Sequence, residues 1–249
     1  MKLISLGKLL LKFNFKYASE LFFWMREIDQ YIKWYQGSRS SLYGVMAPRD
    51  EEKITEFNLR ENAIRTWIRL DATKYLQHLR IPSDYFKGQR ILDVGCGPIP
   101  YALAFEYCDV VGVDPLIDYY REIGYPMKKY SERIKYVHSP IESVPYPDDS
   151  FDAVISVNAL DHVDNFKKAS EEILRLLKPK GVVVLEVHNH SPRIGHPWKL
   201  TDEIIRDSFS SISIRKVFEN RFSDFYDIPE HQEEMLSVWS NISFHVKSG

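Results

Sequence analysis

The chain has 249 residues, of which 44% are hydrophobic and 27% are charged. This composition is typical of a globular protein long enough to bury a core without disulfides. The 33 Lys and Arg residues against 35 Asp and Glu residues give a formal net charge of -2, which disfavours a nucleic-acid partner. No apolar run is long enough to cross a bilayer. The two cysteines, Cys96 and Cys108, are typical of a reducing compartment, so we expect a cytoplasmic protein.

Residues 1–85 contain no β-like run and predict a helical N-terminal extension. Leu9–Gln36 and Glu51–Arg80 show helical apolar spacing, and a loop rich in Gly, Ser and Pro separates them. Met1–Phe15 predicts an amphipathic helix packed on the body, with weak peripheral contact to a membrane surface as the alternative. The aromatic residues of this region either pack helices together or form a lid that stacks on sugar rings or lipid: Phe22, Phe23, Trp24, Tyr31, Trp34, Tyr35 and Tyr43.

From residue 86 onward, short apolar runs alternate with helical segments, which predicts crossover units and a parallel sheet. Five strands are expected at residues 90–94, 109–113, 134–137, 151–157 and 181–187, and helices at 101–107, 116–123, 166–177 and 201–209. Two further strands, at 212–218 and 238–246, are joined by a long hairpin-like return. The fold class is therefore α/β, with a doubly wound, mostly parallel seven-stranded sheet and an antiparallel last strand.

The first strand leads directly into two glycines, Gly95 and Gly97, and the second strand ends at Asp114. Glycine lets the backbone turn sharply beside a ligand. An acidic residue at the end of the second strand can bind the hydroxyls of a ribose. A dinucleotide site would have a third glycine, which is absent here, and no P-loop lysine follows. Asp93 would repel a pyrophosphate but suits a cationic ligand. The pattern favours a nucleoside that carries positive charge.

Four segments in order carry a family resemblance: LDVGCGP, VVGVDP, IESVPYPDDSFDAVISVNALDHV and EILRLLKPKGVVVLEV. Over about residues 90–190 the chain resembles the class I S-adenosylmethionine-dependent methyltransferases, of the methyltransferase domain 11 type. The resemblance implies a Rossmann-like fold, an enzyme, S-adenosylmethionine as cofactor and S-adenosylhomocysteine as product. Together with the change in sequence pattern near residue 86, we expect two parts: a helical extension at 1–85 that forms a lid over the active site, and a cofactor-binding domain at 86–249.

The resemblance also assigns the cofactor-binding residues. Those after the first strand, where Asp93 holds the loop, would line the methionine part: Asp93, Gly95, Cys96 and Gly97. Asp114 would bind the ribose, and Pro115 or Leu116 would lie against the adenine. The backbone of Ile141 and Glu142 would meet the adenine edge, and Asn158 and Ala159 would face the methionine end. Pro140 replaces the Asp that often binds the adenine amino group in this family.

Histidines follow the fourth and fifth strands, where the family places residues that face the acceptor. His162 is the first candidate base, oriented by Asp161 or Asp164, and a structural hydrogen bond is its alternative role. His188 and His190 are further catalytic candidates. A metal bound by these two histidines with His196 and Asp161 is conceivable, but the spacing matches no strong pattern, so we expect none.

The sequence gives less direct evidence about the methyl acceptor than about the cofactor. Asn158–Asp161 lacks the Asn/Asp-Pro-Pro-Tyr/Phe motif of methyltransferases that act on nucleobase amines. Trp198 and the N-terminal aromatic residues favour a small-molecule or glycan acceptor, with a saccharide hydroxyl as the leading choice. The alternatives are N- or C-methylation of another metabolite, a catalytically silent partner subunit, and a nicotinamide-dependent oxidoreductase.

Overall fold

The computed structural model describes residues 15–36, 59, 61–66, 68, 76–77, 79–99, 101–129, 133–193, 195–221 and 234–242. The amphipathic stretch before residue 15, the expected loop with Tyr43 and the final residues of the expected last strand lie outside this description. No helix within the described part of the chain has the length and apolar character needed to cross a membrane.

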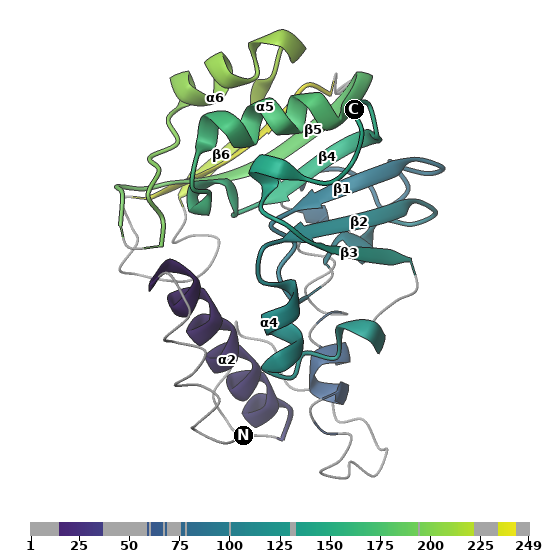
Figure 1. Cartoon of the computed structure of the whole chain (residues 1–249), viewed down its shortest axis with the longest axis vertical. Helices are drawn as coiled ribbons and strands as arrows, with labels where there is room; N and C mark the ends of the chain where they lie inside the picture. Colours follow the sequence, from purple (N-terminus) through teal and green to yellow (C-terminus); the bar gives the residue numbers. More distant parts are fainter. Residues whose placement is uncertain are drawn as a thin grey trace, which may run out of the picture.

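Seven strands form one sheet in the order β3-β2-β1-β4-β5-β7-β6 (Figure 1). The strands are β1 (Arg90–Val94), β2 (Asp109–Asp114), β3 (Ile134–His138), β4 (Phe151–Val157), β5 (Leu177–Asn189), β6 (Arg215–Arg221) and β7 (Met235–Ser240). Strands β1 to β5 pair in parallel, and β7 runs antiparallel to both β5 and β6. The expected fold class, including the antiparallel last strand, is confirmed.

The strand order reverses at β1, which pairs with β2 on one side and β4 on the other. Asp93 in β1 is aligned with Gly112 of β2 and Ile155 of β4. In an open α/β sheet, a ligand binds beyond the carboxyl ends of the strands where the order reverses. The fold therefore directs attention to the ends of β1, β2 and β4.

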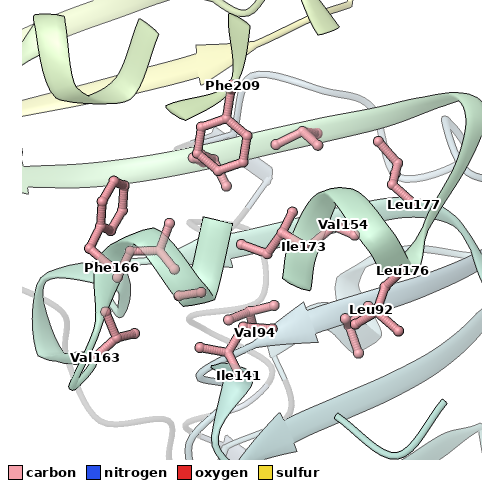
Figure 2. Packing of buried hydrophobic residues seen from close by; sticks show 14 of the residues in the cluster. Leu92, Val94, Ile141, Val154, Val163, Phe166, Ile173, Leu176, Leu177 and Phe209 are labelled. Atoms are coloured by element: carbon pink, nitrogen blue, oxygen red, sulfur yellow. The ribbon is translucent and has the colours of Figure 1, made fainter. Parts of the chain in front are cut away.

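One face of the sheet is covered by α5 (Phe166–Leu176) and α6 (Asp202–Ser208). Figure 2 shows Phe166, Ile173 and Leu176 of α5 beside residues of β1 and β4. These side chains recur at helical spacing, so they form one apolar stripe facing the sheet. The amide of Lys168 donates to Oδ1 of Asn165 at 3.0 Å and so caps the start of α5.

The other face is covered by residues that precede β1 and by the segment between β1 and β2. Phe86 and Phe105 are fully buried there, and their rings pack edge to face with centroids 5.0 Å apart. The helix expected at 101–107 is shorter than predicted, because only the 3-10 helix η1 (Tyr101–Ala104) forms. Tyr107 has a φ of 57°, which is incompatible with continued helix.

The last two strands are displaced by three residues from their expected starts. Residues Ser210–Ile212 form the 3-10 helix η5, and Ser213 then adopts a left-handed conformation, so β6 begins at Arg215. Strand β7 begins earlier, at Met235, where it pairs with Asn189 of β5. The rest of the sheet's connections include α4 (Ile117–Glu122) and the 3-10 helices η2 (Met127–Lys129), η3 (Ile141–Ser143) and η4 (Leu160–His162).

Helix α2 (Phe15–Tyr35) lies within the first expected helix and packs beside α4 (Figure 1). Leu21, Ile28 and Tyr31 are buried in one cluster with Tyr120 of α4. Residues 61–66 of the second expected helix are helical as well. Of the N-terminal aromatic residues, Tyr31 and Tyr35 are buried, Trp24 is partly buried in the same cluster, and Phe22 and Phe23 are exposed.

Candidate functional site

The turn after β1 contains two glycines, the first of which lies against the segment that follows β4. Gly95 and Gly97 have φ values of +67° and +59°, a conformation that side chains other than glycine rarely adopt. The amide of Gly95 donates to the carbonyl of Val113 at 2.9 Å, which holds the turn beside β2. A Cβ on Gly95 would lie 2.3 Å from Cβ of Ala159. The close approach of the two segments therefore requires glycine here.

Asp114 connects this turn to the end of β2. Its Oδ2 accepts a 3.1 Å hydrogen bond from the amide of Gly97, and its Oδ1 accepts a 2.8 Å bond from the amide of Leu116. Burial raises the pKa of Asp114 to about 6, against the lowering effect of these two bonds. Each carboxylate oxygen has more than one lone pair, so a fixed carboxylate of this kind can accept further hydrogen bonds from a ligand.

Asp93 is buried at the end of β1, and Pro115 is partly buried after β2. Cys96 is buried, with its Sγ 2.8 Å from where a Cβ on Gly112 would lie, and burial raises the pKa of its thiol well above the usual value. A protonated thiol packed in this way is inert. The side chain of Cys96 is thus packed within the protein.

The segment after β3 uses its side chains within the protein. Ile141 is buried in the core that α5 covers. Oε1 of Glu142 accepts hydrogen bonds from the amides of Asp164 and Asn165 at 2.8 and 3.0 Å. The Glu142 carboxylate thus fixes the loop that leads into α5, which leaves the backbone of this segment for contact with a ligand.

Asn158 follows β4 and has a φ of 48°. Its amide donates to the carbonyl of Glu186 at 3.2 Å. Among the residues that the structure describes, no group hydrogen-bonds its buried Oδ1. A buried acceptor without a donor is costly, so this oxygen suits a ligand that carries an N–H or O–H group.

Asp161 is the centre of a histidine cluster after β4 and β5. Its Oδ2 lies 2.6 Å from Nδ1 of His196, 3.0 Å from Nε2 of His190 and 3.6 Å from Nε2 of His162. Burial opposes ionisation, but the hydrogen bonds from His190 and His196 hold the pKa of Asp161 well below its usual value. The cluster therefore contains a buried carboxylate whose ionised form is stabilised by its histidine neighbours.

His190 carries the matching positive charge. Its Nδ1 lies 2.7 Å from the carbonyl oxygen of Ser191, and its Nε2 lies 3.0 Å from the carboxylate of Asp161. Both partners are acceptors, so both ring nitrogens must carry a hydrogen. Burial works against the charged form, yet the bonds to Asp161 and Ser191 raise the pKa of His190. His190 and Asp161 form a buried ion pair.

His188 lies in β5 and is buried, with Nε2 2.6 Å from Oε2 of Glu234. Glu234 also pairs with Arg193 at 2.8 Å. Burial lowers the pKa of His188 to about 4, and the neighbouring His190 adds to this effect. His188 is thus a neutral imidazole behind the cluster, joined to it by the ring of His190 at a centroid distance of 4.8 Å.

His162 has the most accessible position of the three candidate bases. Its side chain is 25% exposed, whereas those of His188 and His190 are buried. The ring lies against that of His196, with centroids 3.9 Å apart. Its Nδ1 is 3.9 Å from Oε2 of Glu20 in α2. His162 therefore stands between Asp161 and a carboxylate from the N-terminal helix.

One group of donor atoms in the described part of the chain has the spacing of a metal site. Three possible ligand atoms lie within 4.8 Å of one another, one each from Asp161, His162 and His196. Of the expected metal donors, His188 and His190 are outside this group, and His162 belongs to it although it was not expected as a donor. The hydrogen bonds to Asp161 already account for the position of His196, so the arrangement does not require a cation.

Helix α2 supplies Tyr17 and Glu20, two site residues that the sequence patterns did not single out, beside Trp24, which was expected as a packing or lid residue. Nε1 of Trp24 donates to Oε1 of Glu20 at 2.6 Å, and the Trp24 ring lies 3.2 Å from where a Cβ on Gly97 would be. Burial raises the pKa of Glu20 to about 7, and the negative charge of Asp114 adds to it. Burial raises the pKa of Tyr17, and the negative charges of nearby carboxylates raise it further: Asp164, Glu142 and Asp114. The spacing of residues 17, 20 and 24 is that of one helix face, which is the signal that could have identified them.

Trp198 was expected near the acceptor, and the structure places it at the edge of the core. Its Nε1 donates to the carbonyl of Val163 at 2.9 Å, and its ring packs against that of Phe166. Trp198 follows His196 of the Asp161 cluster by two residues, and Val163, to which it donates, follows Asp161 by two residues.

Comparison with known proteins agrees with this geometry. Residues 92–185 match a family described as a methyltransferase domain. A sterol 24-C-methyltransferase from Gibberella zeae is 31% identical over 136 residues, which is 51% of this chain and 32% of that protein. A demethylmenaquinone methyltransferase from Clavibacter sepedonicus is 37% identical over 100 residues, which is 39% of this chain and 40% of that protein. The chain thus spans well under half the length of these curated relatives.

A solved structure gives the same fold at low sequence identity. The phosphoethanolamine N-methyltransferase 2 of Haemonchus contortus, in complex with phosphomonomethylethanolamine and S-adenosylhomocysteine, has a TM-score of 0.55 and 16% identity. The match covers 76% of this chain and 60% of that one. The similarity supports the fold of the sheet and its helices.

Proposed function

We propose that this chain, whose residues 92–185 match a methyltransferase domain family, is a class I S-adenosylmethionine-dependent methyltransferase that transfers a methyl group from that cofactor to a small polar acceptor. The observation that carries the proposal is the buried Asp114 carboxylate, fixed by the amides of Gly97 and Leu116 at the point where the strand order reverses. It combines a ribose-binding acid with a glycine turn in one place.

The residues present fit a nucleoside sulfonium. Asp93 and Asp114 are both buried near the ends of β1 and β2, and carboxylates of this kind favour a positively charged ligand. The unsatisfied Oδ1 of Asn158 suits the amino group of the methionine part.

Each residue would have a distinct role in holding the cofactor. Asp114 would accept hydrogen bonds from the ribose hydroxyls. Asp93, Gly95, Cys96 and Gly97 would line the methionine part, the last three through their backbone, with Ala159 beside them. Pro115 and the backbone of Ile141 and Glu142 would border the adenine.

When bound, the cofactor supplies a methyl group on a positively charged sulfur. The chain has to align the acceptor, exclude water and take up the proton that the acceptor loses. We assign this proton to Nδ1 of His162, because its Nε2 faces the Asp161 carboxylate. His190 would keep Asp161 ionised and in place, and His188 would support His190 from the β5 side.

The presence of a base next to a charged carboxylate supports an acceptor that must lose a proton, and a hydroxyl of a saccharide or related metabolite is the leading choice. N- or C-methylation of another small metabolite is the second candidate. It is favoured by the similarity to a sterol 24-C-methyltransferase and a demethylmenaquinone methyltransferase. We place the hydroxyl acceptor first because a hydroxyl needs a base such as His162 to remove its proton.

The position of α2 supports a lid function for residues 1–85. Through Trp24 and Glu20, the helix lies against the glycine turn and close to His162. A helix in this position would help to exclude water from the reacting groups.

The test is to incubate the protein with a whole-cell metabolite extract and methyl-labelled S-adenosylmethionine, and to identify labelled products by mass spectrometry. We expect one or a few small polar compounds to gain the label. A His162→Ala variant should retain cofactor affinity and lose most of the labelling. Binding of the cofactor without any labelled product would instead favour a silent partner subunit, and binding of a reduced nicotinamide would favour an oxidoreductase.

A further inference from the structure

Glu20 is a carboxylate that enters the site from outside the nucleotide-binding sheet. One of its oxygens accepts from Trp24, and the other lies 3.9 Å from Nδ1 of His162. The carboxylates of Asp114 and Asp161 both act on it electrostatically. Glu20 therefore lies between the end of β2, where the ribose is proposed to bind, and the cluster after β4, where the acceptor is proposed to bind.

This position corresponds to the middle of the proposed cofactor, where the sulfur and its methyl group would be. The Trp24 side chain, which contacts the glycine turn, also fixes the Glu20 carboxylate by a 2.6 Å hydrogen bond. The carboxylate is thus oriented by its own helix. Its free energy of interaction with a ligand depends on whether the sulfur carries a positive charge.

The charge on the sulfur is also what changes in the reaction. S-adenosylmethionine carries a sulfonium, whereas S-adenosylhomocysteine has a neutral thioether, since the bond pair stays on sulfur when the methyl group leaves. We propose, building on the proposed function, that Glu20 makes the cleft selective for the charged cofactor over its uncharged product. This selectivity would favour loading of the cofactor and release of the product.

The acidity of Glu20 makes this selectivity dependent on pH. Burial and Asp114 raise the pKa of Glu20 to about 7, so the carboxylate is largely protonated at pH 6 and largely ionised at pH 8. The titratable groups that face it are Asp114 at the end of β2, Tyr120 in α4, and Asp161 and His162 in η4. A variant that lacks only the Glu20 carboxylate shows the pH dependence that comes from these other groups, so its comparison with the wild type isolates the titration of Glu20.

The experiment is isothermal titration calorimetry of the full-length protein with S-adenosylmethionine and with S-adenosylhomocysteine, at pH 6 and pH 8. The wild type, Glu20→Gln and Glu20→Asp are compared. Glu27→Gln is the matched control, because Glu27 lies two turns further along the same helix, is buried and pairs with Arg26. The ratio of the two affinities is the readout, and it requires no acceptor.

At pH 8 we expect the wild type to prefer S-adenosylmethionine, and Glu20→Gln to lower this preference by at least about fivefold, as for two charges about 4 Å apart even in bulk water. Glu20→Asp should restore part of it, and Glu27→Gln should leave it unchanged. The wild-type preference should shrink at pH 6, and that of Glu20→Gln should not.

Two results would overturn the proposal in different ways. A preference that is equal in the wild type and Glu20→Gln at pH 8, with both nucleosides bound, would reject the role of Glu20 and leave the proposed function intact. Failure of the wild type to bind either nucleoside would reject both together. If Glu20→Gln and Glu27→Gln reduced both affinities equally, Glu20 would have only a structural role.

Discussion

The contact between Gly95 and Ala159 gives a prediction that can be worked out from the backbone alone. In Gly95→Ala, the new Cβ would lie 2.3 Å from Cβ of Ala159, and the φ of +67° would strain any side chain. The left-handed conformation costs about 1–2 kcal/mol, and overpacking a tight contact costs about 1–3 kcal/mol more. The variant should therefore lose about 2–5 kcal/mol of unfolding free energy.

Gly88→Ala separates these two contributions. Gly88 also has a left-handed φ, of +75°, but a Cβ there would meet nothing within 4 Å. It should cost only the conformational part, about 1–2 kcal/mol. The steric part of the Gly95 effect should be relieved in the double variant Gly95→Ala, Ala159→Gly, with a coupling energy of about 1 kcal/mol or more.

Urea unfolding of the four variants, Gly95→Ala, Gly88→Ala, Ala159→Gly and the double variant, measures these quantities. The reasoning would be refuted if Gly95→Ala were no more destabilising than Gly88→Ala. It would also be refuted if the double variant were as unstable as the sum of the two single changes, since the clash would then not be the cause.

Three further predictions concern titratable residues of the site. Asp114→Asn should weaken S-adenosylmethionine binding by about tenfold or more in calorimetry, because bonds to a charged group contribute about 1.5–3 kcal/mol; Asp118→Asn, an exposed carboxylate on α4, should not. Asp161→Asn should cost about 3–5 kcal/mol in chemical unfolding by leaving the His190 charge buried without its partner, and a loss below 1 kcal/mol would contradict the ion pair. The pKa of His188 is lowered to about 4 in the folded protein, so between about pH 6.5 and 4 the unfolded chain binds a proton at this imidazole and the folded chain does not. The free energy of unfolding should therefore fall as the pH drops from about 6.5 to 4. The slope over that range should be smaller in His188→Gln, and an unchanged slope would contradict the assignment.

The sheet and the glycine turn after β1 were predictable because their signals are local. Gly95, Gly97 and Asp114 follow directly from buried strands, and parallel strands bring their carboxyl ends to one edge. The number of strands and the antiparallel last strand were expected as well, whereas the order of the strands across the sheet was not predicted. The starts of β6 and β7 were each wrong by three residues. Strand β6 starts late because Ser213 ends a 3-10 turn that has no strong sequence signal, and β7 starts early because its pairing with β5 extends to Met235.

The acceptor side depended on contacts between distant segments. The spacing of His188, His190 and His196 gave no means of knowing that Asp161 would bind two of them and that Glu234 would bind the third. Glu20 was missed for a related reason. Its chemistry comes from burial beside Asp114 and His162, which only the packing of α2 against the end of the sheet creates.

The most direct test is a crystal structure of the protein with S-adenosylhomocysteine. We expect the ribose hydroxyls within hydrogen-bond distance of the Asp114 carboxylate and the methionine part beside Gly95 and Asn158. A nucleoside bound elsewhere, or an Asp114 carboxylate that makes no contact with it, would contradict the central claim.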